Sequence, residues 1–154
     1  MNQDFLIRLA ADWTMIPIVL VGAYALIFKI PNNKRLQAYS RILLAGLTAY
    51  LLAKLVGSIF QPETLRPFQS MGKDAGALFL NNPGFPSDHM LFAAAIVAAV
   101  WFETKQKALT YILIALLIIV GVGRVLALVH TPLDVIGGVI IALVGSLWYL
   151  NDKI

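Results

Sequence analysis

The chain contains only two histidines, and each lies near an aspartate where a long apolar run begins. In the stretch "RVLALVHTPLDV", His130 and Asp134 are four residues apart, so they share one face if that turn is helical. A carboxylate so placed can accept a hydrogen bond from one ring nitrogen and leave the other as a nucleophile or base. In "FPSDHM", His89 supplies a second imidazole that can act as an acid or a base. These residues predict nucleophilic and acid–base chemistry.

Cations stand at the ends of the same apolar runs. Arg66 and Arg124 carry guanidinium forks that suit bidentate contact with phosphate, and Lys54 lies within an apolar run. Thr131 is the expected N-cap of a helix whose first residue is Pro132. The N-termini of this helix and of the helix near Ser87 would add unpaired N–H groups and positive dipole ends, which favour a bound anion. We therefore predict a phosphate-binding site. We expect no metal, because two arginines would repel a divalent cation.

Most of these residues also have a purely structural interpretation. Ser87 could serve only as a helix N-cap, and Arg66 and Arg124 could extend their charged ends toward lipid headgroups. Asp134 is harder to explain in that way, because a carboxylate near lipid is costly without a partner. Its nearest partner along the sequence is His130.

Lys54 needs a separate explanation because it lies inside an apolar run. An ionisable residue within a membrane segment is a functional hypothesis by default. Helical side chains lean toward the N-terminus of their helix, which here is away from the other candidate residues. We therefore expect Lys54 to reach the site only if its helix loosens near Gly57 and Ser58.

The elements that position these residues follow from the composition. Of the 154 residues, 60% are apolar and only 13% are charged, which is typical of a membrane protein. The absence of cysteine excludes disulfides, a thiolate nucleophile and a cysteine metal site. The net charge of +4 does not favour nucleic-acid binding, because basic clusters in a membrane chain reflect topology. We predict one all-α membrane domain over residues 1–154.

Apolar runs predict the helices of this polytopic bundle. We expect a short interfacial helix over residues 1–12 and five transmembrane helices over about residues 13–28, 41–60, 87–102, 108–122 and 132–150. The N-terminus lacks the pattern of a cleaved signal peptide, so we expect it to stay attached.

The charges of the links predict the orientation. The links at 29–41 and 103–107 are mainly basic, and Lys153 lies on the same side, so we place this face in the cytoplasm. The N-terminus, the loop 61–86 and all the candidate residues then face outward. The topology is N-out and C-in.

Three stretches together resemble the motifs of the phosphatidic acid phosphatase type 2 superfamily: "LRPF" at 65–68, "FPSDH" at 85–89 and "GRVLALVHTPLD" at 123–134. The chain departs from the family pattern in its first motif, where eleven residues separate Lys54 from Arg66 instead of six and Ile59 occupies the usual lysine position. Gly123 replaces a common serine. Asp88 replaces the usual glycine, a variant similar to the undecaprenyl-diphosphatase branch. The chain is also one span short of the usual six.

The resemblance implies a role for each candidate residue. His130 would attack phosphorus to form a phosphohistidine, Asp134 would orient it, and His89 would protonate the leaving oxygen and then activate water. The phosphoryl oxygens would be held by Arg66, Ser87, Arg124 and Lys54. Asp88 would order a neighbouring cation or help select a diphosphate. The resemblance implies no metal and no other cofactor.

The resemblance and the outward-facing site together suggest a substrate. We expect hydrolysis of undecaprenyl diphosphate to the monophosphate at the outer face of a bacterial cytoplasmic membrane, which recycles the carrier lipid for peptidoglycan and cell wall biogenesis. The alternatives are a phosphatase of phosphatidylglycerophosphate or phosphatidate, and a non-enzymatic lipid-phosphate binding or transport protein. The expected partners are an isoprenoid or glycerolipid phosphate and membrane lipids. The oligomeric state is left open.

Overall fold

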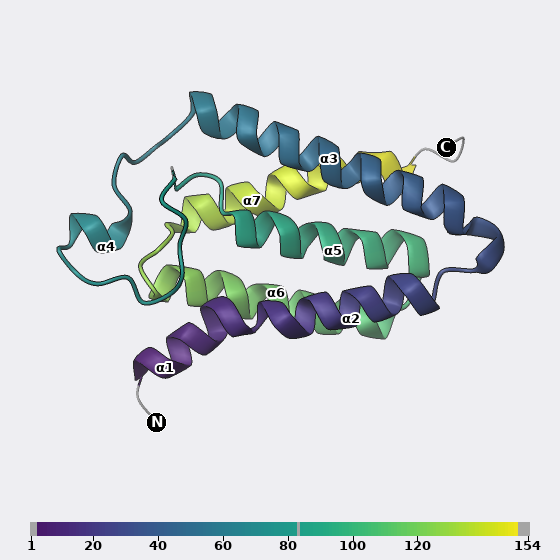
Figure 1. Cartoon of the computed structure of the whole chain (residues 1–154), viewed down its shortest axis with the longest axis horizontal. Coiled ribbons are helices and arrows are strands. Elements are labelled where there is room, and N and C mark those ends of the chain that lie inside the picture. Colours follow the sequence, from purple (N-terminus) through teal and green to yellow (C-terminus); the bar gives the residue numbers. More distant parts are fainter. Residues whose placement is uncertain (1–2, 83, 151–154) are drawn as a thin grey trace.

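The computed structural model describes residues 3–82 and 84–150, which form helices and connecting segments without a strand (Figure 1). In chain order the elements are α1 (Gln3–Arg8), the π-helical turn η1 (Leu9–Trp13), α2 (Met15–Phe28), the 3₁₀ turn η2 (Asn32–Lys34), α3 (Arg35–Ile59), α4 (Pro67–Ser70), α5 (Asp88–Thr104), α6 (Lys107–Leu126), α7 (Pro132–Gly145) and the 3₁₀ turn η3 (Ser146–Leu150). The predicted all-α membrane helix bundle is confirmed.

Among the described residues, four helical segments are long and apolar enough to cross a membrane: 3–28, 32–59, 107–126 and 132–150. The chain is therefore an integral membrane protein. The third predicted transmembrane helix, at 87–102, corresponds to α5, which has 17 residues and is not one of these four. It lies at the centre, packed against α2, α3, α6 and α7. Its buried alanines, such as Ala93, Ala94 and Ala98, explain this position, because small side chains let neighbouring helices approach closely.

The described part of the predicted N-terminal helix, from Gln3 onward, is helical and leads into the first span, while residues 1 and 2 lie outside the described residues and the interfacial position stays a prediction. α1 passes through the π-helical turn η1 into α2, and η1 packs against the end of α6. Gly123 on α6 makes this contact possible, since a Cβ there would lie 2.6 Å from the backbone nitrogen of Ala11. The N-terminal segment is thereby held beside the last turn of α6.

The helix α3 begins at Arg35, about six residues earlier than the sequence indicated. Charged residues of the predicted link are thus helical, and Arg41 forms two 2.8 Å contacts with Glu103 at the end of α5. Both side chains are largely buried. Such an ion pair lowers the cost of placing charge in a membrane helix, and the linear sequence does not reveal it.

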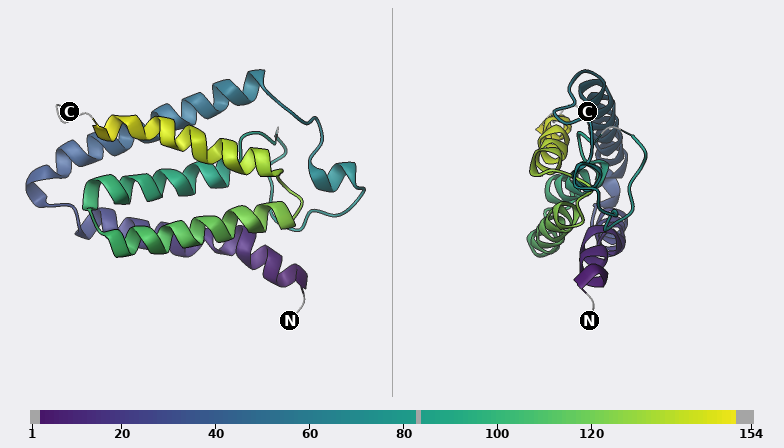
Figure 2. Two further views of the ribbon diagram at one scale, coloured as in Figure 1. Left: turned by 180° about the vertical axis from the view of Figure 1, so that it is seen from behind. Right: turned by 90° about the vertical axis from the view of Figure 1, so that its left-hand side faces the viewer.

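Figures 1 and 2 show the segment between α3 and α5 passing over one end of the bundle, where α3 and α6 end and α5 and α7 begin. We call this the loop end. The N-terminal helix α1 also reaches it, and η3 lies at the opposite end, because α2, α3, α5, α6 and α7 run along the bundle in alternating directions. The side of the membrane that the loop end faces stays a prediction. Lys153, one of the charges behind that prediction, lies outside the described residues.

Candidate active site

The first turns of α5 and α7 meet at the loop end. The backbone N–H of Ser87 donates to the carbonyl oxygen of Asp134 at 3.0 Å, which ties the two helix starts together. Gly138 permits the approach, because a Cβ there would lie 2.7 Å from the carbonyl oxygen of Ser87. This junction brings both histidines to the same place, because His89 lies just after Ser87 and His130 lies just before α7.

The α7 start holds the predicted His130–Asp134 pair. The imidazole Nδ1 of His130 lies 3.4 Å from Asp134 Oδ2, a long hydrogen bond, and both side chains are buried. Thr131 is the N-cap, as predicted: its Oγ1 accepts from Asp134 N at 3.2 Å and its own N–H donates to Asp134 Oδ2 at 2.8 Å. Because Asp134 faces Nδ1, Nε2 of His130 is the nitrogen available for chemistry.

His130 lies in the link between two spans, and its surroundings favour the neutral ring. Burial lowers its pKa below the usual 6.5, the hydrogen bond with Asp134 raises it, and the charges of Arg124 and Arg66 lower it further. The net direction is downward, so the imidazole is neutral near pH 7. A neutral imidazole keeps the lone pair that a nucleophile needs.

A small cavity of about 60 Å³ lies beside His130 and is large enough for a phosphoryl group. It is lined by Arg66, Leu80, Asn82, Pro86, Asp88, His89, Arg124 and His130. We call it the phosphate cavity. Five residues predicted from three separate stretches therefore gather around one small volume. Leu80 and Asn82, from the loop, were not predicted from the sequence.

Two polar atoms of the candidate site are buried without a hydrogen-bond partner among the described residues: Ser87 Oγ and Arg124 Nε. Ser87 stands at the N-cap of α5, but its hydroxyl makes no capping bond, so the alternative that it only caps the helix is not supported. An unsatisfied buried polar group costs about 1–3 kcal/mol. Such atoms are expected where a ligand completes the hydrogen bonding.

Arg66 and Arg124 are both buried, at 7% and 1% exposure, which argues against side chains that extend to lipid headgroups. Arg66 Nη1 donates to the carbonyl oxygen of Val129 at 2.6 Å, and Nη2 donates to Asn82 Oδ1 at 2.9 Å. Burial lowers the pKa of Arg66, and the charges of Asp134 and Asp88 partly offset this. A guanidinium nevertheless keeps its charge in proteins.

Arg124 has a partner that sequence reasoning missed. Its Nη1 donates to Asp12 Oδ1 and to the carbonyl oxygen of Leu78, both at 2.8 Å. Asp12 lies in η1, just ahead of α2. The signal that could have identified it is the same one used for Asp134: a carboxylate at the edge of an apolar run needs a partner.

Lys54 reaches the region by a different route from the one predicted. α3 stays helical through Ile59, so the loosening near Gly57 and Ser58 that a direct approach to the site would require does not occur. Instead, the missing side chain at Gly57 lets residues 85 and 86 approach α3, since a Cβ there would lie 2.9 Å from the carbonyl oxygen of Phe85. Lys54 Nζ then lies 3.3 Å from Asp88 Oδ1. Lys54 does not line the phosphate cavity itself.

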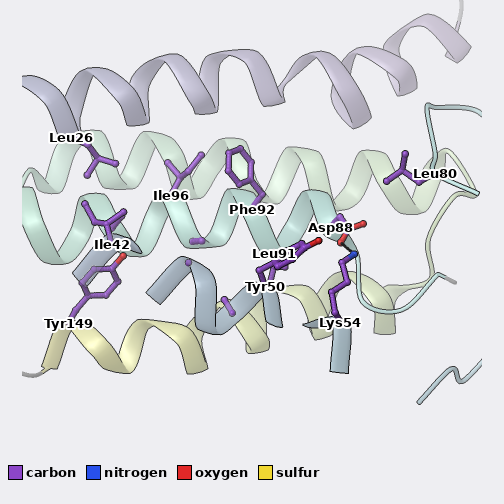
Figure 3. Close-up of a pocket in the computed structure, with 14 residues that line it drawn as sticks. Leu26, Ile42, Tyr50, Lys54, Leu80, Asp88, Leu91, Phe92, Ile96 and Tyr149 are labelled. Carbon is purple, nitrogen blue, oxygen red and sulfur yellow. Dashed lines mark hydrogen bonds and ion pairs between the residues drawn. The ribbon is translucent and has the colours of Figure 1, made fainter. Parts of the chain in front are cut away.

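A larger apolar groove opens next to this ion pair. It measures about 530 Å³ and is lined mainly by side chains of α3 and α5, with Leu26 from α2 and Tyr149 from η3. Figure 3 shows the Lys54–Asp88 pair at one end of it, with Tyr50 and Phe92 further along and Tyr149 at the other end. Asp88 and Leu80 line both the apolar groove and the phosphate cavity. The two spaces are therefore neighbours.

Within the described ranges, no three His, Asp or Glu side chains gather in a way that could hold a metal ion. Comparison with protein families gives one match: a family model described as PAP2 superfamily covers residues 36–153. The matched segment includes all three motif regions and α3 to α7. The comparison with curated proteins and the comparison with solved structures gave no match.

Proposed function

We propose that this chain, which belongs to the PAP2 superfamily, hydrolyses undecaprenyl diphosphate to the monophosphate through a phosphohistidine, without a metal. Members of this superfamily are phosphatases, which supports a lipid phosphate substrate, and the four apolar helices support a membrane setting. The finer assignment rests mainly on one observation. One phosphoryl-sized cavity, next to an apolar groove, is lined by both histidines and by two buried arginines. Next to it along the chain is Ser87, whose buried hydroxyl has no partner among the described residues.

The first chemical step is an in-line attack. Nε2 of neutral His130 attacks the terminal phosphorus of the diphosphate, a P–N bond forms, and the bond to the bridging oxygen breaks. His89 takes up a proton from solvent when the diphosphate anion binds beside it, because a nearby anion favours the charged imidazole. It gives this proton to the bridging oxygen, so the lipid monophosphate leaves. Asp134 holds Nδ1 and stabilises the positive charge that develops on the ring.

The second step releases inorganic phosphate. His89, now neutral, takes a proton from a water molecule whose oxygen attacks the phosphorus. The P–N bond breaks, inorganic phosphate forms, and His130 returns to its neutral state. Arg66, Arg124 Nε and Ser87 Oγ stabilise the charge on the phosphoryl oxygens in both transition states.

The apolar groove supports a lipid rather than a water-soluble substrate. Its walls are mostly aliphatic and aromatic, and its polar end, at Lys54 and Asp88, adjoins the phosphate cavity. A lipid chain could therefore lie in the groove while its phosphate occupies the cavity. In this arrangement Lys54 is placed to contact the second phosphate of a diphosphate, which favours this substrate over a phosphomonoester.

The substrate assignment is tested by phosphate release from a panel of lipids in detergent, with a chelator present. We expect the highest kcat/KM on undecaprenyl diphosphate, and lower values on phosphatidylglycerophosphate and phosphatidate. Preference for either glycerolipid would support the alternative phosphatase instead. Binding without release from any of the three would support a binding or transport protein. Loss of activity with the chelator would contradict the metal-free mechanism.

Replacement of Asp88 tests its role in substrate selection. In Asp88→Gly, Lys54 loses its 3.3 Å partner, while the residues that hold the reacting phosphoryl group remain. We expect the ratio of kcat/KM for the diphosphate to that for phosphatidate to change severalfold, with a smaller change in total turnover. Asp74→Gly, in the exposed loop, is the matched control. An equal loss on every substrate would argue for a purely structural role of Asp88.

A further inference from the structure

The mechanism above does not use Asp12, although its surroundings are unusual for a carboxylate. Asp12 lies in the π-helical turn η1, and its side chain is only 10% exposed. Its Oδ1 lies 2.8 Å from Nη1 of Arg124, whose side chain is 1% exposed. This ion pair joins residues 112 positions apart in the sequence. Asp12 is therefore held against a residue of the phosphate cavity.

The second carboxylate oxygen of Asp12 ties the loop into the same arrangement. Asp12 Oδ2 accepts a hydrogen bond from Leu78 N at 2.9 Å, while the carbonyl oxygen of Leu78 accepts from Arg124 Nη1 at 2.8 Å. The three residues thus form a closed set of contacts. Leu80, two residues further along the loop, lines the phosphate cavity. The backbone from Leu78 to Leu80 therefore links Asp12 to the part of the cavity wall that Leu80 forms.

These contacts restrict the orientation of the Arg124 guanidinium group beside the phosphate cavity. Both hydrogen bonds given to the protein by its guanidinium come from Nη1. Nε is buried and has no partner among the described residues, and Arg124 lines the phosphate cavity together with His89 and His130. A guanidinium is planar, so fixing Nη1 on two acceptors restricts where Nε can point.

The backbone is also arranged to bring Asp12 to this place. Gly123 precedes Arg124, and a Cβ there would lie 2.6 Å from Ala11 N and 2.7 Å from the carbonyl carbon of Ala10. Ala11 is completely buried in the contact. A side chain at position 123 would push η1 away from α6 and so separate Asp12 from Arg124. Glycine at this position therefore serves the same ion pair.

We propose that Asp12 is a positioning residue, which holds Arg124 and Leu78 so that the Nε edge of Arg124 faces the phosphoryl group of the substrate. The proposal rests on the proposed function only in identifying the anion as substrate. The rival explanation is that Asp12 merely neutralises a buried arginine and affects stability alone. The positioning role predicts weaker anion binding by a folded Asp12 variant, whereas a role in stability alone predicts unchanged anion binding.

The test compares Asp12→Asn with the unsubstituted chain, both in detergent. Asparagine keeps the size of the side chain but removes its charge, so Arg124 loses its ionic partner. We expect equilibrium binding of inorganic phosphate and orthovanadate to weaken roughly tenfold or more, the typical contribution of one charge-assisted hydrogen bond. The kcat/KM for the lipid should fall by a similar factor. Asp4→Asn, exposed on α1, is the control and should change neither quantity.

Anion binding is measured separately from turnover, so the two proposals can fail separately. If the unsubstituted chain hydrolyses no lipid phosphate, the proposed function fails, while phosphate and orthovanadate binding still decides the role of Asp12. A folded Asp12→Asn variant that binds both anions as tightly as the unsubstituted chain overturns the positioning role. An unsubstituted chain that binds neither anion also overturns it.

A double variant covers the case in which Asp12→Asn does not fold. Asp12→Asn combined with Arg124→Gln removes both charges, and we compare it with Arg124→Gln alone. If Asp12 acts through Arg124, the two proteins have equal anion affinity and equal residual turnover. A further loss of either quantity in the double variant overturns the proposal, because Asp12 would then act through another group.

Discussion

Replacing His130 with alanine should lower phosphate release from the lipid diphosphate by about 10⁴-fold or more, because the reaction loses its nucleophile. The fold should survive the change. Asp134 keeps its 2.8 Å hydrogen bond from Thr131 N, and the capping arrangement at the start of α7 does not depend on the imidazole. Initial rates of phosphate release in detergent, together with the thermal unfolding midpoint, measure the two expectations.

The covalent intermediate gives an independent check on His130. Rapid quenching of the unsubstituted chain with a phosphate-labelled lipid should trap a protein-bound phosphate that is stable in alkali and labile in acid, as expected for a phosphoramidate. The His130→Ala variant should trap none. Lys73→Ala, at an exposed position in the loop, is the control and should behave as the unsubstituted chain. Phosphate release that persists in a folded His130→Ala variant would contradict the assigned mechanism.

Replacing His89 with asparagine should lower turnover of the lipid diphosphate by about 10²- to 10⁴-fold, the usual contribution of a general acid or base. Both steps should slow, because the leaving oxygen lacks a proton donor and the attacking water lacks a base. The change should leave the start of α5 intact. The backbone N–H of His89 lies in the first turn of α5, and asparagine keeps it, while the side chain that changes lines the phosphate cavity. The measurement is the steady-state rate of phosphate release.

A substrate with a better leaving group separates the two steps for His89. An aryl phosphate needs little protonation of its leaving oxygen, so the first step should recover in His89→Asn while the second stays slow. We expect a burst of the phenol followed by slow turnover, with phosphohistidine accumulating on His130. If the aryl phosphate and the lipid lose rate equally, without a burst, His89 is not the acid of the first step.

Local spacing was enough to predict part of the site. The separation of His130 from Asp134 predicted their contact, and Thr131 with Pro132 predicted the helix start that holds them. These features depend on residues within one helical turn, so the sequence pattern carries them directly. The three motif stretches also indicated which distant side chains belong to one site, and all three lie within the segment that matches the family model.

Contacts between distant segments could not be predicted in this way. The Asp12–Arg124 pair depends on close backbone approach at Gly123, and the Lys54–Asp88 pair depends on close approach at Gly57. A glycine in the sequence shows that close approach is possible but does not name the partner. The apolar groove was likewise not predicted, because its walls come from α2, α3, α5 and η3 together.

The amino-acid sequence was enough to predict the all-α membrane architecture and five of the side chains that line the phosphate cavity. Apolar runs of bilayer length and residue types with fixed local spacing carry that information. Three further properties emerged from the folded structure: the buried polar atoms without partners among the described residues, the pairing of each carboxylate with its cation, and the place where the apolar groove meets the phosphate cavity. These properties arise from packing between helices, and packing is set by shape complementarity across segments that lie far apart in the chain.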